Sequence, residues 1–274
     1  MLTAILASSV AVFLFPPVPQ SQAYHNLADK RALAGIPNFL NVASNVLFLF
    51  VGVLGIRFVL HGSRGTEARA LPTVIPSTEE SGSGGSGLID PREHWPYWAF
   101  FLGVAMTTFG SAYYHLDPRD GTLLWDRIPM AISFTALVAA TVSERISVAA
   151  GLWLLLPVLT SGVGSVVYWD LTQKSGRGDL RPYILTQFGS AFVIILLISL
   201  FPPRYTRGSD VIIALTIYAS AKVFEAADGV IFALGGIVSG HTLKHITAAI
   251  SAYWILRMLL LREAKAFPTL RDTG

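Results

Sequence analysis

The stretch FLNVASNVLFLFVGVLGIRFVL, residues 39–60, is long enough and apolar enough to cross a lipid bilayer as a helix. Similar runs recur along the 274 residues, of which 53% are hydrophobic and only 14% charged. A soluble domain of this size would need many more charges to cover its surface. An open sheet would leave backbone groups unpaired in hydrocarbon, so the runs are expected to be helices. The sequence therefore predicts an all-α integral membrane protein.

Seven core spans are predicted, and we expect them to form a seven-transmembrane helix bundle. They cover Phe39–Leu60, Trp95–Tyr114, Leu123–Val142, Ser147–Trp169, Tyr183–Phe201, Val211–Leu234 and His241–Leu261. The connections are short except for a predicted flexible loop at 62–93, which contains the Gly/Ser-rich residues 81–87. We therefore expect one domain over residues 24–262, followed by a C-terminal tail at 263–274.

The chain begins with a further apolar run, Leu2–Phe15, which is shorter than a comfortable span. It is followed by a proline-rich turn, and Ser21-Gln22-Ala23 then resembles a small-x-small cleavage site. Residues 1–23 are therefore expected to be either a cleaved signal peptide or an eighth helix. Both interpretations start in the cytosol and place Tyr24 on the opposite side of the membrane.

Basic residues in the loops are divided unequally between the two sides of the bundle. The richer side is the one that also carries the C-terminus, and it holds Arg64, Arg69, Arg92, Arg145, Arg204, Arg207, Arg262, Lys265 and Arg271. The positive-inside rule places this side in the cytosol. The formal net charge of +3 is spread between apolar runs, so it indicates a bilayer surface and not a nucleic-acid partner.

Polar side chains inside membrane spans are costly, and most of those found here share one depth. Odd-numbered spans begin on the face where even-numbered spans end, so groups near those ends should meet close to the non-cytosolic face. The groups concerned are Ser44, Asn45, Ser111, His115, Asp126, Asp228, His241 and His245. Lys222 lies apart from them, and the depth of Glu225 is left open; the two are most simply interpreted as an internal ion pair. The shared depth predicts a functional site.

Three histidines in this layer form a candidate metal site. His241 and His245 are four residues apart and would share one helix face, and His115 would add a third ligand from another span. Three neutral imidazoles plus water are the open tetrahedral arrangement of a catalytic zinc ion. The alternative is a set of hydrogen-bonded histidines without a metal. The third histidine and the carboxylates at matching depth favour the metal.

A zinc-bound water also needs a base and a group that stabilises the oxyanion. Asp126 is the candidate base; its alternative role is to pair with the adjacent Arg127. Ser111 lies one turn before the first metal ligand and is the candidate group to hold the water or to donate to the oxyanion, unless it bonds to its own helix. Asp228 is predicted to orient one histidine by accepting a hydrogen bond from its ring. Ser44 and Asn45 are predicted either to do the same or to join helices by hydrogen bonds.

In this order the motifs resemble the alkaline ceramidases, which belong to a wider group of membrane hydrolases that includes the adiponectin and progestin receptors. The matching pieces are Asn41-Val-Ala-Ser44-Asn45, Ser111-Ala-Tyr-Tyr-His115, Leu124-Trp-Asp126-Arg-Ile-Pro129-Met130, Asp228 and His241-Thr-Leu-Lys-His245. The resemblance extends from about Tyr24 to Leu261. The step of eleven residues from His115 to Asp126 is similar to that of the ceramidase branch.

The resemblance implies a seven-helix amidase that cleaves a ceramide into a sphingoid base and a fatty acid. By matching position, the three histidines would bind zinc, Asp126 would activate water and Ser111 would assist at the oxyanion. Some animal members also have a calcium site before the first core helix. The corresponding stretch here has only Asp29 as an acid, which argues against calcium. The expected partner is a lipid within the bilayer, with no protein partner evident.

Three other functions would also use intramembrane polar groups. A lipid-responsive receptor of the same architecture would keep zinc as a structural ion and turn over little or no substrate. A haem protein would use intramembrane histidines as axial ligands, but it would not need Asp126. A transporter is the weakest alternative, because the sequence has no repeats or paired broken helices.

Overall fold

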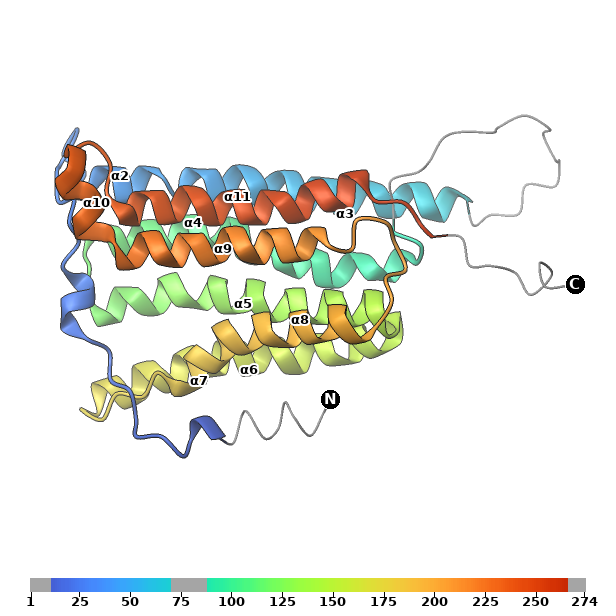
Figure 1. Ribbon diagram of the computed structural model, residues 1–274, viewed down its shortest axis with the longest axis horizontal. Coiled ribbons are helices and arrows are strands. Elements are labelled where there is room, and N and C mark those ends of the chain that lie inside the picture. The colour runs from blue at the N-terminus through green and yellow to red at the C-terminus, as the bar shows by residue number, and fades with distance from the viewer. Residues whose placement is uncertain (1–10, 70–87, 266–274) are drawn as a thin grey trace, which may run out of the picture.

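The computed structural model describes residues 11–69 and 88–265, and this part of the chain is helical, with no strand. The long elements lie side by side along the long axis of the molecule (Figure 1). The helices are α2 (Phe39–Ala43), α3 (Val46–Arg69), α4 (His94–Leu116), α5 (Asp120–Arg145), α6 (Val148–Lys174), α7 (Arg181–Ile184), α8 (Ser190–Leu200), α9 (Asp210–Ala226), α10 (Asp228–Gly235) and α11 (Gly240–Leu261). Short 3₁₀ turns lie at Gln22–His25 (η1) and Pro91–Glu93 (η2), and a π-helical segment, Leu185–Gly189 (η3), joins α7 to α8.

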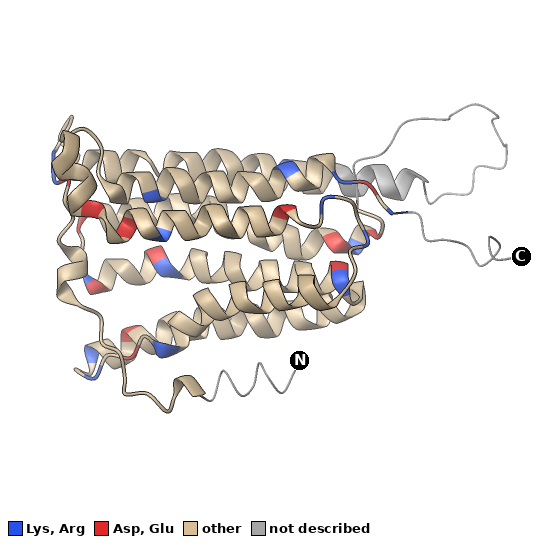
Figure 2. Cartoon of the chain, viewed as in Figure 1, with Lys and Arg blue, Asp and Glu red and all other residues tan. Residues whose placement is uncertain are grey.

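Four helical stretches of the described residues are long and apolar enough to cross a membrane. They are Phe39–His61, Asp120–Arg145, Val148–Lys174 and Arg181–Leu200. Charged residues gather mainly toward the two ends of the helices (Figure 2). The prediction of an all-helical protein with helices able to span a membrane is therefore confirmed.

The other three predicted spans coincide with α4, with α9 and α10, and with α11. Helix α9 has only 17 residues and ends at a break around Ala227, where α10 begins. Helices α4 and α11 carry histidines and hydroxyl groups in their turns, which lowers their hydropathy.

Two close helix contacts determine how the elements approach one another. A side chain at Gly110 of α4 would meet the carbonyl oxygen of Trp125 on α5 at 2.1 Å. A side chain at Gly240, the first residue of α11, would meet the carbonyl oxygen of Phe224 at 2.2 Å. Glycine is therefore required at both positions, and it brings α4 against α5 and α11 against α9.

One helix boundary differs clearly from the predicted loop. Helix α3 continues to Arg69, so it enters the predicted flexible loop 62–93, because the helix does not need an apolar sequence once it leaves the core. Residues 70–87 lie outside the described part of the chain, as do residues 1–10 of the predicted leader 1–23 and residues 266–274 of the tail. The beginning of the tail 263–274 is held in place, since Glu263 accepts a backbone hydrogen bond from Thr206 at 2.8 Å.

A buried charged network closes the end of the bundle where α11 finishes. The guanidinium of Arg262, only 1% exposed, donates to Glu144 at 3.1 Å and to the hydroxyl of Tyr97 at 3.2 Å. It also lies 3.9 Å from the ring centre of Tyr205, whose hydroxyl donates to Glu93 at 2.6 Å. The network joins α11 to α4, to α5 and to the loop before α9.

Candidate metal centre

The three predicted histidines come together at the other end of the bundle. His115 ends α4, while His241 and His245 lie in the first two turns of α11, and all three are buried. Their ligand nitrogens lie within 4.8 Å of one another. The Nε2 atoms of His115 and His245 are 3.2 Å apart. Two imidazoles on one tetrahedral ion would be separated by roughly 3.3 Å, given metal–nitrogen distances of about 2.0–2.1 Å. The group could therefore hold one metal ion.

The start of α11 sets the orientation of this pair of histidines. Ser239 caps the helix by accepting a hydrogen bond from the backbone N–H of Thr242 at 3.2 Å. Asp228 accepts from the backbone N–H of His241 at 2.7 Å and from that of Ala28 at 2.9 Å. Asp228 was expected to hold a histidine ring, but it binds the backbone instead. It therefore positions the first turn of α11, and with it the ring of His241.

Ser44 is the predicted supporting residue that reaches a ring directly. Its hydroxyl lies 2.9 Å from Nδ1 of His245, which leaves Nε2 of that ring for a metal. Asn45, by contrast, donates to the backbone carbonyl of Asn41 at 2.7 Å, and its own carbonyl accepts from Thr108 at 3.2 Å. The contact with Thr108 is made by the backbone oxygen of Asn45, and its side-chain amide bonds only to the preceding turn, so the side chain reaches neither a histidine ring nor α4.

We expect Ser44→Ala to weaken metal binding by roughly 10- to 100-fold, because outer partners of ligating histidines have effects of this size. Competition with a chelator of known affinity would measure the change. Ser199→Ala is the matched control, since its hydroxyl bonds to its own helix far from the histidines, at the carbonyl of Ile195. Equal affinities for the two variants would contradict the role assigned to Ser44.

Asp126 and Ser111 lie beside the histidines. Both line the cavity that His245 also lines. Arg127 is directed elsewhere: its guanidinium donates to Gln20 at 2.5 Å and lies 4.2 Å from the ring centre of Trp169. The contacts of Arg127 therefore do not support the alternative in which Asp126 serves only to pair with it.

Lys244 is a site residue that the sequence analysis missed. Its ammonium group donates to Glu225 at 2.6 Å and lies 3.4 Å from Nε2 of His241. Lys222 and Glu225 form the predicted ion pair, and Tyr24 also donates to Glu225, at 2.9 Å. Glu225, whose depth was left open, thus belongs to the polar layer. The signal was present in the position of Lys244 between two histidines on one helix.

Asn41 is the second missed residue. It is fully buried, and its side-chain oxygen accepts from Thr242 at 2.8 Å and from Ser239 at 3.4 Å. These contacts join α2 to the first turn of α11. The clue was a buried amide in the same short motif as Ser44.

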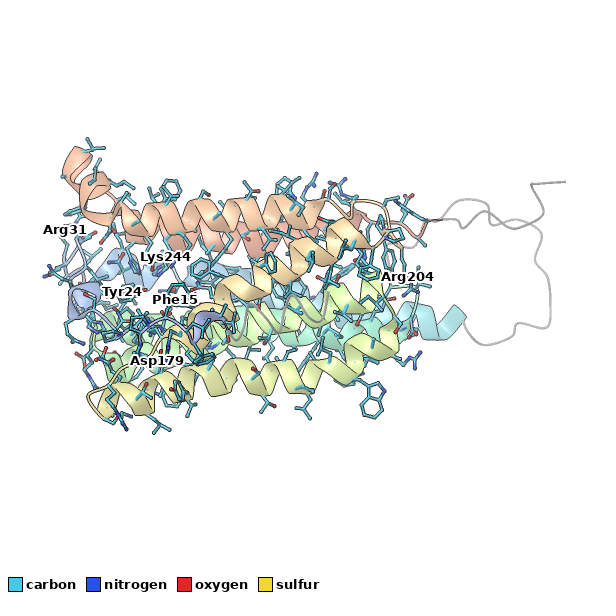
Figure 3. The ribbon with its side chains drawn as sticks, turned by 60° about the horizontal axis from the view of Figure 1, so that its bottom comes forward. Phe15, Tyr24, Arg31, Asp179, Arg204 and Lys244 are labelled. Atoms are coloured by element: carbon cyan, nitrogen blue, oxygen red, sulfur yellow. The ribbon has the colours of Figure 1, made fainter. Side chains whose placement is uncertain are left out.

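The N-terminal segment crosses this end of the bundle (Figure 1). His25 lies 2.9 Å from Asp120 and 3.0 Å from the hydroxyl of Tyr114. Arg31 donates to the carbonyls of Gly236 and Ile237, both at 2.7 Å, and its hydrogen bonds to Asp29 lower the pKa of that carboxyl. Asp29, the one acid of the stretch considered for calcium, is therefore paired with a cation. Figure 3 shows Tyr24, Arg31 and Lys244 at this end and Arg204 at the opposite one.

An apolar cavity of about 100 Å³ extends from the histidine layer into the bundle. Ser111, Asp126, Lys244 and His245 form its polar end. Lys222 and a few hydroxyl groups also line the cavity, but most of its remaining wall is apolar. Helices α3, α4, α5, α8, α9 and α11 contribute to it, among others with Phe48, Val104, Leu137, Ile194, Leu215 and Ile255. A chain of methylene groups could occupy this space while a polar group stays at the histidines.

Fold and site together define an all-helical, membrane-type protein with a buried three-histidine group at one end of an apolar cavity. Neither protein-family models nor curated proteins nor solved structures give a match to this chain.

Proposed function

We propose that this chain is a seven-helix, zinc-dependent membrane amidase that hydrolyses ceramide or a related N-acyl lipid, as its resemblance to the alkaline ceramidases implies. The observation that carries the proposal is the position of Asp126 and Ser111 beside three converging histidines, at the polar end of an apolar cavity. A structural histidine cluster would need neither the carboxylate nor the cavity.

The donor set fits zinc. Three buried imidazoles without cysteine or carboxylate ligands match the three-histidine catalytic sites in which a fourth position is open to water. When bound, zinc lowers the pKa of a coordinated water and polarises a carbonyl oxygen.

The chain's own residues supply the remaining steps. Ser44 holds His245 through Nδ1 and so fixes the ring orientation. The carboxylate of Asp126 accepts the proton of the attacking water and returns it to the amide nitrogen as the bond to the acyl carbon breaks. The hydroxyl of Ser111 donates to the carbonyl oxygen as negative charge develops there. The apolar cavity holds the acyl chain and keeps bulk water away.

The proposed function also includes an orientation of the helices in the membrane. The four apolar stretches, together with α4, α9–α10 and α11, would make up the seven spans. We place the histidine layer near the non-cytosolic face and the C-terminus in the cytosol, because basic loop residues are more numerous on the C-terminal side. A lipid amide lies near the headgroup boundary, so the substrate could enter sideways with its tails among the helices.

Purified protein supplied with zinc should release fatty acid from a labelled ceramide or from another N-acyl lipid of similar chain length. Lipidomics of cells with the intact protein and with His245→Ala would identify the physiological substrate, which should accumulate in the variant. Metal binding without release of fatty acid from any N-acyl lipid would favour the receptor alternative and contradict the proposal.

A further inference from the structure

A second cavity adjoins the first, and its walls are far more polar than those of the first. It measures about 110 Å³, several times the space that one water molecule needs. Asp126, Met130, Lys222 and Lys244 line both cavities, so the two meet at the candidate base. The far side of the second cavity is formed by Tyr24, Arg127, Leu180, Tyr183, Ile184 and Gln187.

Positive charge exceeds negative charge around this second cavity. Among the described residues, its lining includes the cations Arg127, Lys222 and Lys244 and the carboxylates Asp126 and Glu225. Glu225 is already bound by both lysines, so it has little capacity left for the arginine. Unbalanced buried charge is expensive in a membrane protein, and the excess here calls for an anion.

Arg127 is the cation with unused hydrogen-bonding capacity. It is 6% exposed, and one terminal nitrogen donates to Gln20. The other, Nη1, is buried and has no hydrogen-bond partner among the described residues. A planar guanidinium is suited to binding a carboxylate or phosphate. Trp169, at 4.2 Å from the guanidinium carbon, holds the group in place.

We propose that the polar cavity binds an anionic group, a carboxylate or phosphate, carried on the amine side of the N-acyl lipid. This inference rests on the proposed function for the position of the scissile amide. With the carbonyl at Asp126 and His245 and the acyl chain in the apolar cavity, the amine side faces Arg127. The enzyme would then select lipids with an anionic head over neutral ones of equal chain length.

Two probes that differ mainly in this charge test the proposal: N-palmitoylglycine, which carries a carboxylate, and N-palmitoylethanolamine, which carries a neutral hydroxyl. We expect kcat/KM to favour the glycine lipid by about tenfold or more in the unmodified protein, the size of one hydrogen bond to a charged group. Arg127→Gln should lower that ratio about tenfold, and Arg127→Lys should lower it less. Arg181→Gln is the matched control, because Arg181 pairs with Asp179 outside the cavity and its loss should leave the ratio unchanged.

A binding arm separates this proposal from the proposed function. His115→Ala combined with His245→Ala removes the metal ligands, and displacement of a fluorescent acyl probe then reports affinity without turnover. An Arg127-dependent preference for the anionic lipid in this background would support the subsite even if neither lipid were hydrolysed. Equal affinity for the two lipids, or a ratio unaffected by Arg127→Gln, would overturn it. Inorganic phosphate and acetate form a third arm, and competition by either at concentrations matching the lipid would show recognition of a free anion instead of a lipid head.

Discussion

Replacing His245 by alanine is expected to abolish stoichiometric metal binding. Removal of an outer partner of a ligating histidine already costs roughly 10- to 100-fold in affinity, and loss of a ligand should cost more. The effect should be large here because only three histidines converge, two of them with Nε2 atoms 3.2 Å apart. Mass spectrometry of the metal content per chain would show about one zinc in the unmodified protein and a small fraction of that in the variant.

His61→Ala is the control for this experiment. His61 is exposed on α3, where its ring bonds to the carbonyl of Arg57 at 2.7 Å, and it lies outside the histidine group. Its replacement should leave metal content unchanged. Retention of a full zinc complement by His245→Ala would exclude the three-histidine site and remove the basis of the amidase proposal.

Asp126→Asn is expected to lower kcat by about 10²- to 10⁴-fold, the range attributed to a general base, while the metal stays bound. Asparagine keeps nearly the same shape but cannot accept the proton of the attacking water. The measurement is turnover of a labelled N-acyl lipid, together with metal content on the same sample. The rate and the metal content must both be measured, because a loss of metal would by itself explain a loss of rate.

Asp170→Asn provides the comparison for buried acids. Asp170 is 6% exposed at the same end of the bundle and pairs with Lys174 at 2.7 Å. Its replacement should leave the rate nearly unchanged, since its partner is exposed and it lines neither cavity. A similar rate loss in both variants would mean that Asp126 acts through stability and not through chemistry.

Hydropathy was sufficient to predict the helical elements, because a bilayer leaves few options for the backbone. Each predicted span overlaps helical residues of the structure. Local detail was harder to predict. The π-helical segment Leu185–Gly189 and the break at Ala227 depend on packing between helices. The hydrophobic pattern of a single segment does not predict such packing.

The histidine layer could be inferred from depth alone, since residues at the ends of antiparallel spans must come close. The hydrogen-bond partners of these residues could not be inferred from depth. Asp228 was expected at a ring, but it begins α10 after the break at Ala227, and there its carboxylate accepts from the backbone N–H of His241. Lys244 was overlooked because Glu225 already had a plausible partner one turn away in Lys222.

The Arg262 network and the histidine layer lie at opposite ends of α4. Glu93 and His115 are separated by about 33 Å of helix at 1.5 Å per residue. Substitutions that far apart, without shared partners, usually have additive free energies. Arg262 also lies 3.8 Å from Glu93. Damage to this pair should therefore destabilise the fold without reaching the histidines, so a Glu93 variant that still folds should keep its full metal content.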